Sequence, residues 1–85
     1  MKNKEIIANA AVKAGMLTEI EAKDAIERDI EISLHTVQGW NLHGSYRVRD
    51  GEEGIEVKLW KKKEGENKFY LAKAYLYRLE QLEAI

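Results

Sequence analysis

The sequence predicts an α+β fold in which an N-terminal αα-hairpin packs on a small antiparallel β-sheet of about three strands. Apolar residues recur with helical spacing in residues 1–32 and alternate with charged residues in much of residues 45–79. A length of 85 residues suits one domain, residues 1–85, and 45% hydrophobic residues is typical of a folded protein. Residues 80–85 are expected to form a C-terminal helical turn.

The first 32 residues carry the signals of two short helices. Asn3 can cap the first helix, and Gly15 can end it. Thr18 and Glu21 have the spacing of a capping box, which predicts the start of a second helix. The residues expected to face inward are Ile6, Ile7, Ala10, Ala11, Ala14, Ala22, Ala25, Ile26 and Ile30. Because alanine buries little apolar area, these helices must gain stability by packing on a larger apolar surface downstream.

The second half of the chain carries the signals of strands. Apolar and charged residues alternate in Tyr46–Arg49 and again from Ile55 to Trp60, which indicates two strands. The glycines of Asp50–Gly54, which connects them, permit the positive φ of a tight turn. A third strand is expected from Phe69 to Leu79. Because apolar residues occupy both of its faces, it is expected to be central and covered on both sides.

Two interpretations fit residues 33–44. Leu34, Val37 and Trp40 have the spacing of a short helix, whereas a β-hairpin from Val37 to Val48 fits the same residues. We prefer a short helix or loop for this segment.

Several classes of function have no support in the sequence. The chain has no cysteine, which excludes disulfides, thiolate nucleophiles and cysteine-based zinc sites. It shows no signal peptide and no membrane-spanning run, so we expect a cytoplasmic protein with no membrane partner. His35 and His43 are the only histidines, and no motif supplies further metal ligands, a nucleophile or a nucleotide-binding loop. We therefore expect no metal, no cofactor and no enzymatic activity.

Charge is unevenly distributed along the chain. The net charge is −1, which argues against a strongly electrostatic nucleic-acid binder. Residues 1–35 contain five basic and seven acidic groups, whereas residues 36–79 contain nine basic and six acidic groups. Lys61 begins a run of three lysines in this basic part. Such a run can contact phosphates, or it can simply protect a strand edge from aggregation.

The predicted sheet combines cationic and aromatic residues. Alternation places Arg47 and Arg49 on one face of the first strand, and Lys58 and Trp60 on one face of the second. If these faces coincide and Lys73 or an aromatic residue of the third strand joins them, they form a surface that suits single-stranded nucleic acid. On such surfaces each stacked base contributes about 1–3 kcal/mol. The competing interpretation is that Trp60 packs in the core beneath the helices.

One pattern resembles a known family. It consists of Trp40 and Gly44, then Val48, Gly51, Glu52, Gly54 and Ile55, a lysine-rich strand, and an aromatic strand that ends near Leu79, Glu80 and Gln81. Over residues 36–82 this pattern is similar to the N-terminal domain of ArdC-type antirestriction proteins. That family occurs in conjugative plasmids and phages and is associated with single-stranded DNA binding. Asp50 and Glu53 stand where the family usually has lysines, which removes two positive charges from the expected DNA-facing turn.

The resemblance and the basic strands together lead to two hypotheses. In the first, the chain is a small phage or mobile-element accessory protein that binds single-stranded DNA, with Trp40 stacking on bases or anchoring the fold. The candidate DNA-binding residues are Arg47, Arg49, Lys58, Trp60, Lys61 and Trp40. In the second, it is a protein–protein inhibitor or adaptor, an anti-defence factor that binds a host protein through the helical hairpin or an exposed aromatic patch. We also consider a homodimer, because a chain of this length builds only a small core.

Overall fold

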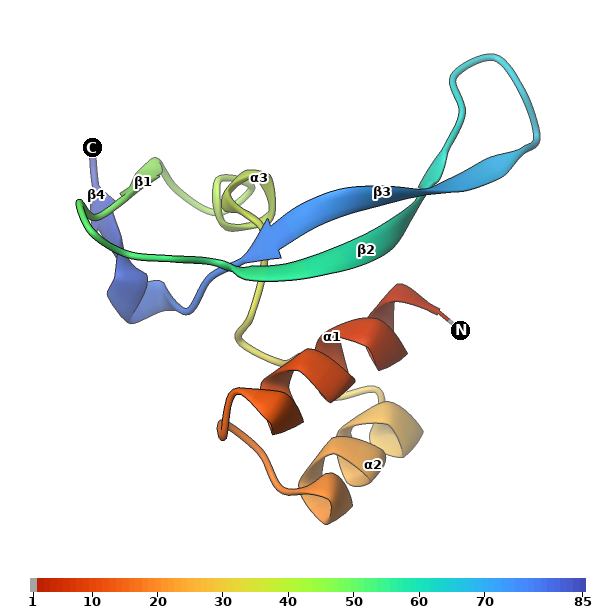
Figure 1. The fold of residues 1–85 in the computed structure, drawn as a ribbon, viewed down its shortest axis with the longest axis horizontal. Coiled ribbons are helices and arrows are strands. Elements are labelled where there is room, and N and C mark those ends of the chain that lie inside the picture. Colours follow the sequence, from red (N-terminus) through yellow and green to blue (C-terminus); the bar gives the residue numbers. More distant parts are fainter. Residues whose placement is uncertain (1) are drawn as a thin grey trace.

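The computed structural model describes residues 2–85 and confirms the α+β class (Figure 1). The helices are α1 (Asn3–Lys13), α2 (Glu19–Arg28), α3 (Val37–Trp40) and the 3-10 helix η1 (Leu79–Gln81). The strands are β1 (Tyr46–Val48), β2 (Ile55–Lys62), β3 (Phe69–Leu76) and β4 (Leu82–Ala84). Within these residues, no helix has both the length and the apolar character needed to cross a membrane.

The start of α1 differs from the prediction. Lys2, not Asn3, is the cap residue, and its N–H donates to the Glu5 carboxylate over 3.1 Å. The Asn3 side chain is unavailable as a cap because both of its polar atoms bond to the backbone of Trp60. Gly15 follows the end of α1 with a φ of 75°, as expected of a glycine that stops a helix.

The predicted start of α2 is confirmed. The Thr18 hydroxyl accepts the Glu21 N–H over 3.1 Å, and the Glu21 carboxylate accepts the Thr18 N–H over 3.0 Å, which completes the capping box. Ala22 and Ala25 are buried. Ile30 was wrongly expected to face inward: α2 ends at Arg28, and the Ile30 side chain beyond it is 47% exposed.

The strands form two separate antiparallel pairs rather than one sheet of about three strands. β2 pairs with β3, and β1 pairs with β4 at the end of the chain. Residues 50–54 are therefore a connection between two sheets and not a hairpin turn. The predicted helical turn over residues 80–85 is confirmed only for Glu80 and Gln81, which belong to η1. It is wrong from Leu82 on, because β4 follows η1 directly and pairs with β1.

The prediction of a central third strand is also wrong. β3 ends at Leu76, it borders only β2, and five of its eight residues are exposed. Its apolar residues occupy both faces because one face packs on the core while the other carries exposed side chains. In residues 33–44 the predicted short helix is confirmed as α3, whose cap Thr36 accepts the Gly39 N–H over 3.1 Å.

The hydrophobic core is small and lies between the helical hairpin and one face of β2–β3. Ala10, Ala11, Leu34 and Leu76 form the buried cluster, and side chains from β2 pack against it. Leu34 and Leu76 are the only large side chains among the described residues that are fully buried. In Figure 1, α1 and α2 lie together on one side of the β2–β3 hairpin. β1 and β4 lie at the end of this hairpin that is farther from its tip.

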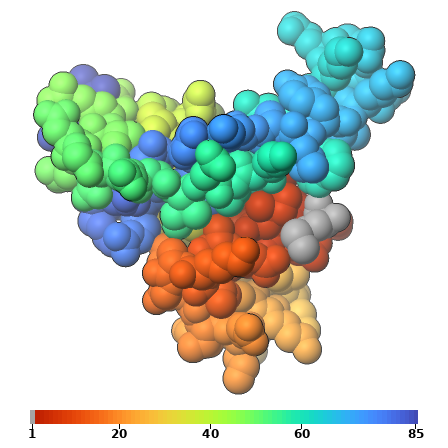
Figure 2. All heavy atoms as spheres, in the orientation of Figure 1, coloured from red at the N-terminus to blue at the C-terminus, as the bar shows by residue number. Residues whose placement is uncertain are grey.

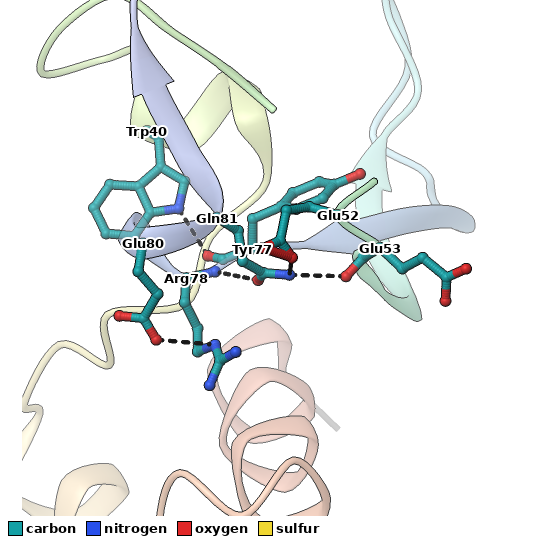
Figure 3. A network of polar contacts seen from close by, with 7 residues as sticks. All are labelled: Trp40, Glu52, Glu53, Tyr77, Arg78, Glu80 and Gln81. Atoms are coloured by element: carbon teal, nitrogen blue, oxygen red, sulfur yellow. Dashed lines mark hydrogen bonds and ion pairs between the residues drawn. The ribbon is translucent and has the colours of Figure 1, made fainter. Parts of the chain in front are cut away.

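Gln81 joins the two sheets through a buried polar network (Figure 3). The residue is 7% exposed. Its side-chain oxygen accepts the Arg78 N–H over 2.9 Å, and its amide nitrogen donates to the Glu53 carbonyl over 2.9 Å and to the Glu52 carboxylate over 3.4 Å. Its own carbonyl accepts the Arg49 N–H over 2.9 Å. This one side chain therefore fixes the connection between β1 and β2 against the C-terminal segment.

The two glycines of that connection have different roles. Gly51 has a φ of 84°, as predicted for a turn glycine. Gly54 is needed for space, because a Cβ atom there would lie 2.7 Å from the Tyr77 ring and 2.8 Å from the Tyr75 Cβ. The close approach of β2 to the end of β3 thus depends on the absence of a side chain at position 54.

Candidate functional site

The β2–β3 hairpin has one face on the core and one face in solvent. Ile55, Val57 and Leu59 pack against the core cluster, and the residues between them point the other way. We call the solvent side the open face. It is made of Glu56, Lys58, Trp60 and Lys62 from β2 and Phe69, Leu71, Lys73 and Tyr75 from β3, all of them exposed.

The strand register arranges the open face in four cross-strand rows. Along the hairpin toward its tip, the rows are Glu56 with Tyr75, Lys58 with Lys73, Trp60 with Leu71, and Lys62 with Phe69. Successive rows lie about 7 Å apart, which is two residues of extended strand. The second and fourth rows therefore carry lysine, whereas the first, third and fourth rows carry an aromatic ring.

The indole of Trp60 is accessible on this face and is not sealed in the core. Its residue is 39% exposed, compared with 45% for Tyr75 and 63% for Phe69. The Trp60 N–H donates to the Asn3 side-chain oxygen over 2.7 Å, and the Trp60 carbonyl accepts from the Asn3 amide over 3.0 Å. Because α1 fixes the backbone of Trp60 in this way, the ring is held on a defined part of the hairpin.

Two lysines lie directly opposite each other in the middle of the open face. Lys58 and Lys73 are a cross-strand pair, and like charges in that position destabilise a sheet unless an anion relieves the repulsion. Glu56 partly provides this, since its carboxylate lies 3.5 Å from the Lys73 ammonium and accepts the Tyr75 hydroxyl over 3.3 Å. No carboxylate of residues 2–85 forms an ion pair with Lys58. This row has the charge to hold an anionic group.

The hairpin also concentrates positive charge relative to the rest of the molecule. Residues 55–76 contain six basic and three acidic groups, whereas the remaining residues contain eight basic and twelve acidic groups. The tip of the hairpin stands clear of the body, as Figure 2 shows. A polyanion that approaches the tip therefore meets the basic part of the chain first.

Arg47 and Arg49 do not join the open face. Arg47 is in β1 and Arg49 follows it, so both belong to the other sheet. The Arg47 guanidinium bonds to the Glu83 carboxylate over 2.6 Å, and that of Arg49 lies 3.9 Å from the same carboxylate. The expectation that these arginines share a surface with Lys58 and Trp60 is not met, because β1 pairs with β4 and not with β2.

Lys61 and Trp40 also lie elsewhere. Lys61 is opposite Tyr70 on the other face of the hairpin. The Trp40 indole N–H donates to the Tyr77 carbonyl over 2.8 Å, and its ring meets the His35 ring edge-on at a centroid distance of 4.8 Å. Trp40 is only partly exposed, so of its two predicted roles the structure places it as an anchor of α3 against Tyr77, the residue after β3.

The open face also contains residues that sequence reasoning did not single out. Lys73 was expected only as a conditional member, and Tyr75, Leu71 and Phe69 were not named individually. Alternation along β3 could have found them, because it puts all four on one face. No local signal could have shown that Asn3 fixes the backbone of Trp60, since the two residues are 57 positions apart.

The fold and the open face together define a small α+β protein with a basic, ring-bearing β-hairpin. The chain matches no protein-family model, and it has no significant match among curated proteins or solved structures. Within the described residues, no group of three or more histidine and carboxylate side chains is arranged to hold a metal ion.

Proposed function

We propose that this protein binds single-stranded DNA through the open face of the β2–β3 hairpin, as a small accessory protein of a phage or another mobile element. The observation that carries the proposal is the cross-strand pair Lys58–Lys73 next to the exposed ring of Trp60. The similarity of residues 36–82 to ArdC-type N-terminal domains supports the same ligand. Trp40 and the arginines of the other sheet are not part of this interface.

The chemistry of binding follows from the order of the rows. Phosphates pair with the ammonium groups of Lys58 and Lys73, and this relieves the repulsion between the two lysines. Bases stack on Trp60 and, toward either end, on Tyr75 and Phe69. None of these contacts reads a base edge, so binding should tolerate most sequences and should weaken with salt.

The test is a titration of fluorescently labelled single-stranded and double-stranded oligonucleotides at about 50 and about 200 mM salt. We expect a preference for the single strand with a Kd of about 1–100 μM. Trp60→Ala should weaken binding at least about fivefold, which is the lower limit of one lost stacking contact. Lys58→Ala should reduce the slope of log K against log salt by about 0.7, which corresponds to one phosphate contact.

Matched controls come from the opposite face of the same hairpin. Tyr70→Ala removes an exposed ring, and Lys61→Ala removes a cation next in sequence to Trp60. Both should change binding less than their counterparts on the open face. Wild-type binding that ignores salt, or equal losses from the two faces, would reject this interface.

One observation favours a second function, the binding of a host protein. The tip carries apolar side chains on both faces, since Tyr70 is 48% exposed opposite the side that carries Phe69 and Leu71. A nucleic-acid platform does not require the ring of Tyr70, whereas a protein partner that encloses the tip would use it. A stoichiometric host protein that is retained after nuclease treatment, and is lost with Tyr70→Ala but not with Lys58→Ala, would support this function.

A further inference from the structure

The outer edge of β3, the side away from β2, has backbone groups that find no partner among residues 2–85. On β2, the N–H and carbonyl of Trp60 both bond to Asn3, so they point away from β3. Trp60 is opposite Leu71. In such a non-hydrogen-bonded antiparallel pair both residues direct their backbone groups outward, so the N–H and carbonyl of Leu71 point away from β2.

The same direction holds for every second residue of the strand, and Tyr77, which directly follows β3, continues it. The Tyr77 N–H donates to the His35 carbonyl over 2.8 Å, and the Tyr77 carbonyl accepts the His35 N–H over 3.2 Å. His35 thus covers this end of the edge, and α3 lies beside it (Figure 1). Toward the tip, Phe69, Leu71 and Lys73 direct their backbone groups outward and find no partner among residues 2–85.

This uncovered edge has the properties that proteins normally avoid. It is extended, and it presents Phe69 at 63% exposure and Leu71 at 47% exposure with Lys73 as its one charged member. The small core contributes little stability to offset the cost of this exposed edge, because only two large side chains in the described chain are fully buried. A further strand on this edge would satisfy the backbone groups and cover apolar surface at the same time.

We propose that the partner strand is β3 of a second copy of this chain, paired antiparallel about a two-fold axis at Leu71. The two hairpins then form one four-stranded sheet in the order β2, β3, β3 and β2. An edge of this kind offers a copy of itself donors and acceptors in matching order. The inference rests on backbone pairing of the chain alone and does not require nucleic-acid binding.

The charges along the edge favour this register over one centred on Lys73. An axis at Leu71 sets Leu71 opposite Leu71 of the second copy and Phe69 opposite Lys73, which brings a ring and an ammonium together. An axis at Lys73 would set two lysines directly opposite each other and would bring the second copy toward α3. The two basic hairpins repel each other in any register, so salt should strengthen the dimer by screening. Nucleic-acid binding has the opposite salt dependence, so the failure of one proposal can be distinguished from that of the other.

The first experiment measures the oligomeric state by sedimentation equilibrium, without nucleic acid, at low and high salt. The wild type should form a concentration-dependent dimer that is tighter at high salt. Leu71→Pro removes the outward N–H of residue 71 and leaves every hydrogen bond to β2 in place. In the dimer, the two backbone hydrogen bonds that join residue 71 of one copy to residue 71 of the other are then lost. We expect its dimer Kd to rise at least tenfold, whereas Leu71→Ala, which keeps the N–H, should change it less. A wild type that stays monomeric throughout, or a proline variant that dimerises like the wild type, overturns the proposal.

A second experiment does not depend on how well the proline variant folds. The chain has no cysteine, so single cysteines report contacts without background. Leu71→Cys places two thiols opposite each other at the axis and should give a covalent dimer on mild oxidation. Glu56→Cys lies on the same face but on β2, opposite Tyr75, so in the four-stranded sheet its two copies would be about 14 Å apart across the strands and about 27 Å apart along them, or about 30 Å in all. Equal cross-linking of the two variants, or none with Leu71→Cys, would exclude this arrangement.

Discussion

The base and the tip of the β2–β3 hairpin share the same two strands but have opposite environments. At the base, Ile55 and Leu76 face each other in the core, and Gly54 lies against the Tyr77 ring. At the tip, the strands leave the body and almost every side chain is exposed (Figures 1 and 2). A two-stranded hairpin is only marginally stable alone, so the base must hold the tip in shape. Stability and surface chemistry are therefore separated along one hairpin.

Two leucines of β3 test this separation most strongly. Leu76 is fully buried, and Leu71 is 47% exposed. Leu76→Ala should lower the free energy of unfolding by about 2–5 kcal/mol, because it leaves a cavity in a small core. Leu71→Ala should change it by less than about 0.5 kcal/mol. Urea denaturation at a low, fixed protein concentration measures both, and similar losses would mean that base and tip contribute equally.

A smaller effect is expected from the polar side of the base. Gln81→Ala removes the acceptor for the Arg78 N–H and the donor to the Glu53 carbonyl, in a residue that is 7% exposed. Leaving such groups without partners should cost about 1–3 kcal/mol of stability. Glu80→Ala is the matched control, because the Glu80 side chain is 71% exposed. If the two variants have the same urea midpoint, the buried network does not hold the sheets together.

Local signals predicted the helices but not how the strands pair. The capping box of Thr18 and Glu21 spans three residues, so the sequence alone contained it. The pairing of β1 with β4 joins Arg47 to Glu83, 36 positions apart, and no local pattern determines such a choice. β4 has only three residues, which is too short for the alternation of apolar and polar residues to distinguish a strand from a turn.

For the candidate site too, what depends on a single strand was predicted correctly, and what depends on strand pairing was not. Lys58 and Trp60 belong to one strand, and period-two alternation correctly put them on one face. Arg47 and Arg49 could be assigned to that face only by assuming how their strand pairs, and the assumption was wrong. Two residues of the family-like pattern have structural roles. The Trp40 indole bonds to the Tyr77 carbonyl, and Gly54 leaves space for the Tyr77 ring. These signature residues therefore identify the base rather than the surface that would bind a ligand.

The smallest expected effect is an acid sensitivity of the helical hairpin on which the base rests. The Thr18 N–H and hydroxyl lower the pKa of Glu21, and the Lys4 ammonium lowers that of Asp29 through a hydrogen bond and its charge. A carboxyl group whose pKa falls on folding stabilises the folded state above its ordinary pKa, near pH 4, and this contribution disappears as the pH drops through the folded value. The melting temperature should therefore decrease more steeply below about pH 4 in the wild type than in Glu21→Gln/Asp29→Asn. Glutamine at position 21 can still accept the Thr18 N–H, but neither amide is charged, so the double variant should melt slightly below the wild type near neutral pH and close to it in acid. Parallel acid profiles for the two proteins would show that neither carboxylate couples folding to protonation.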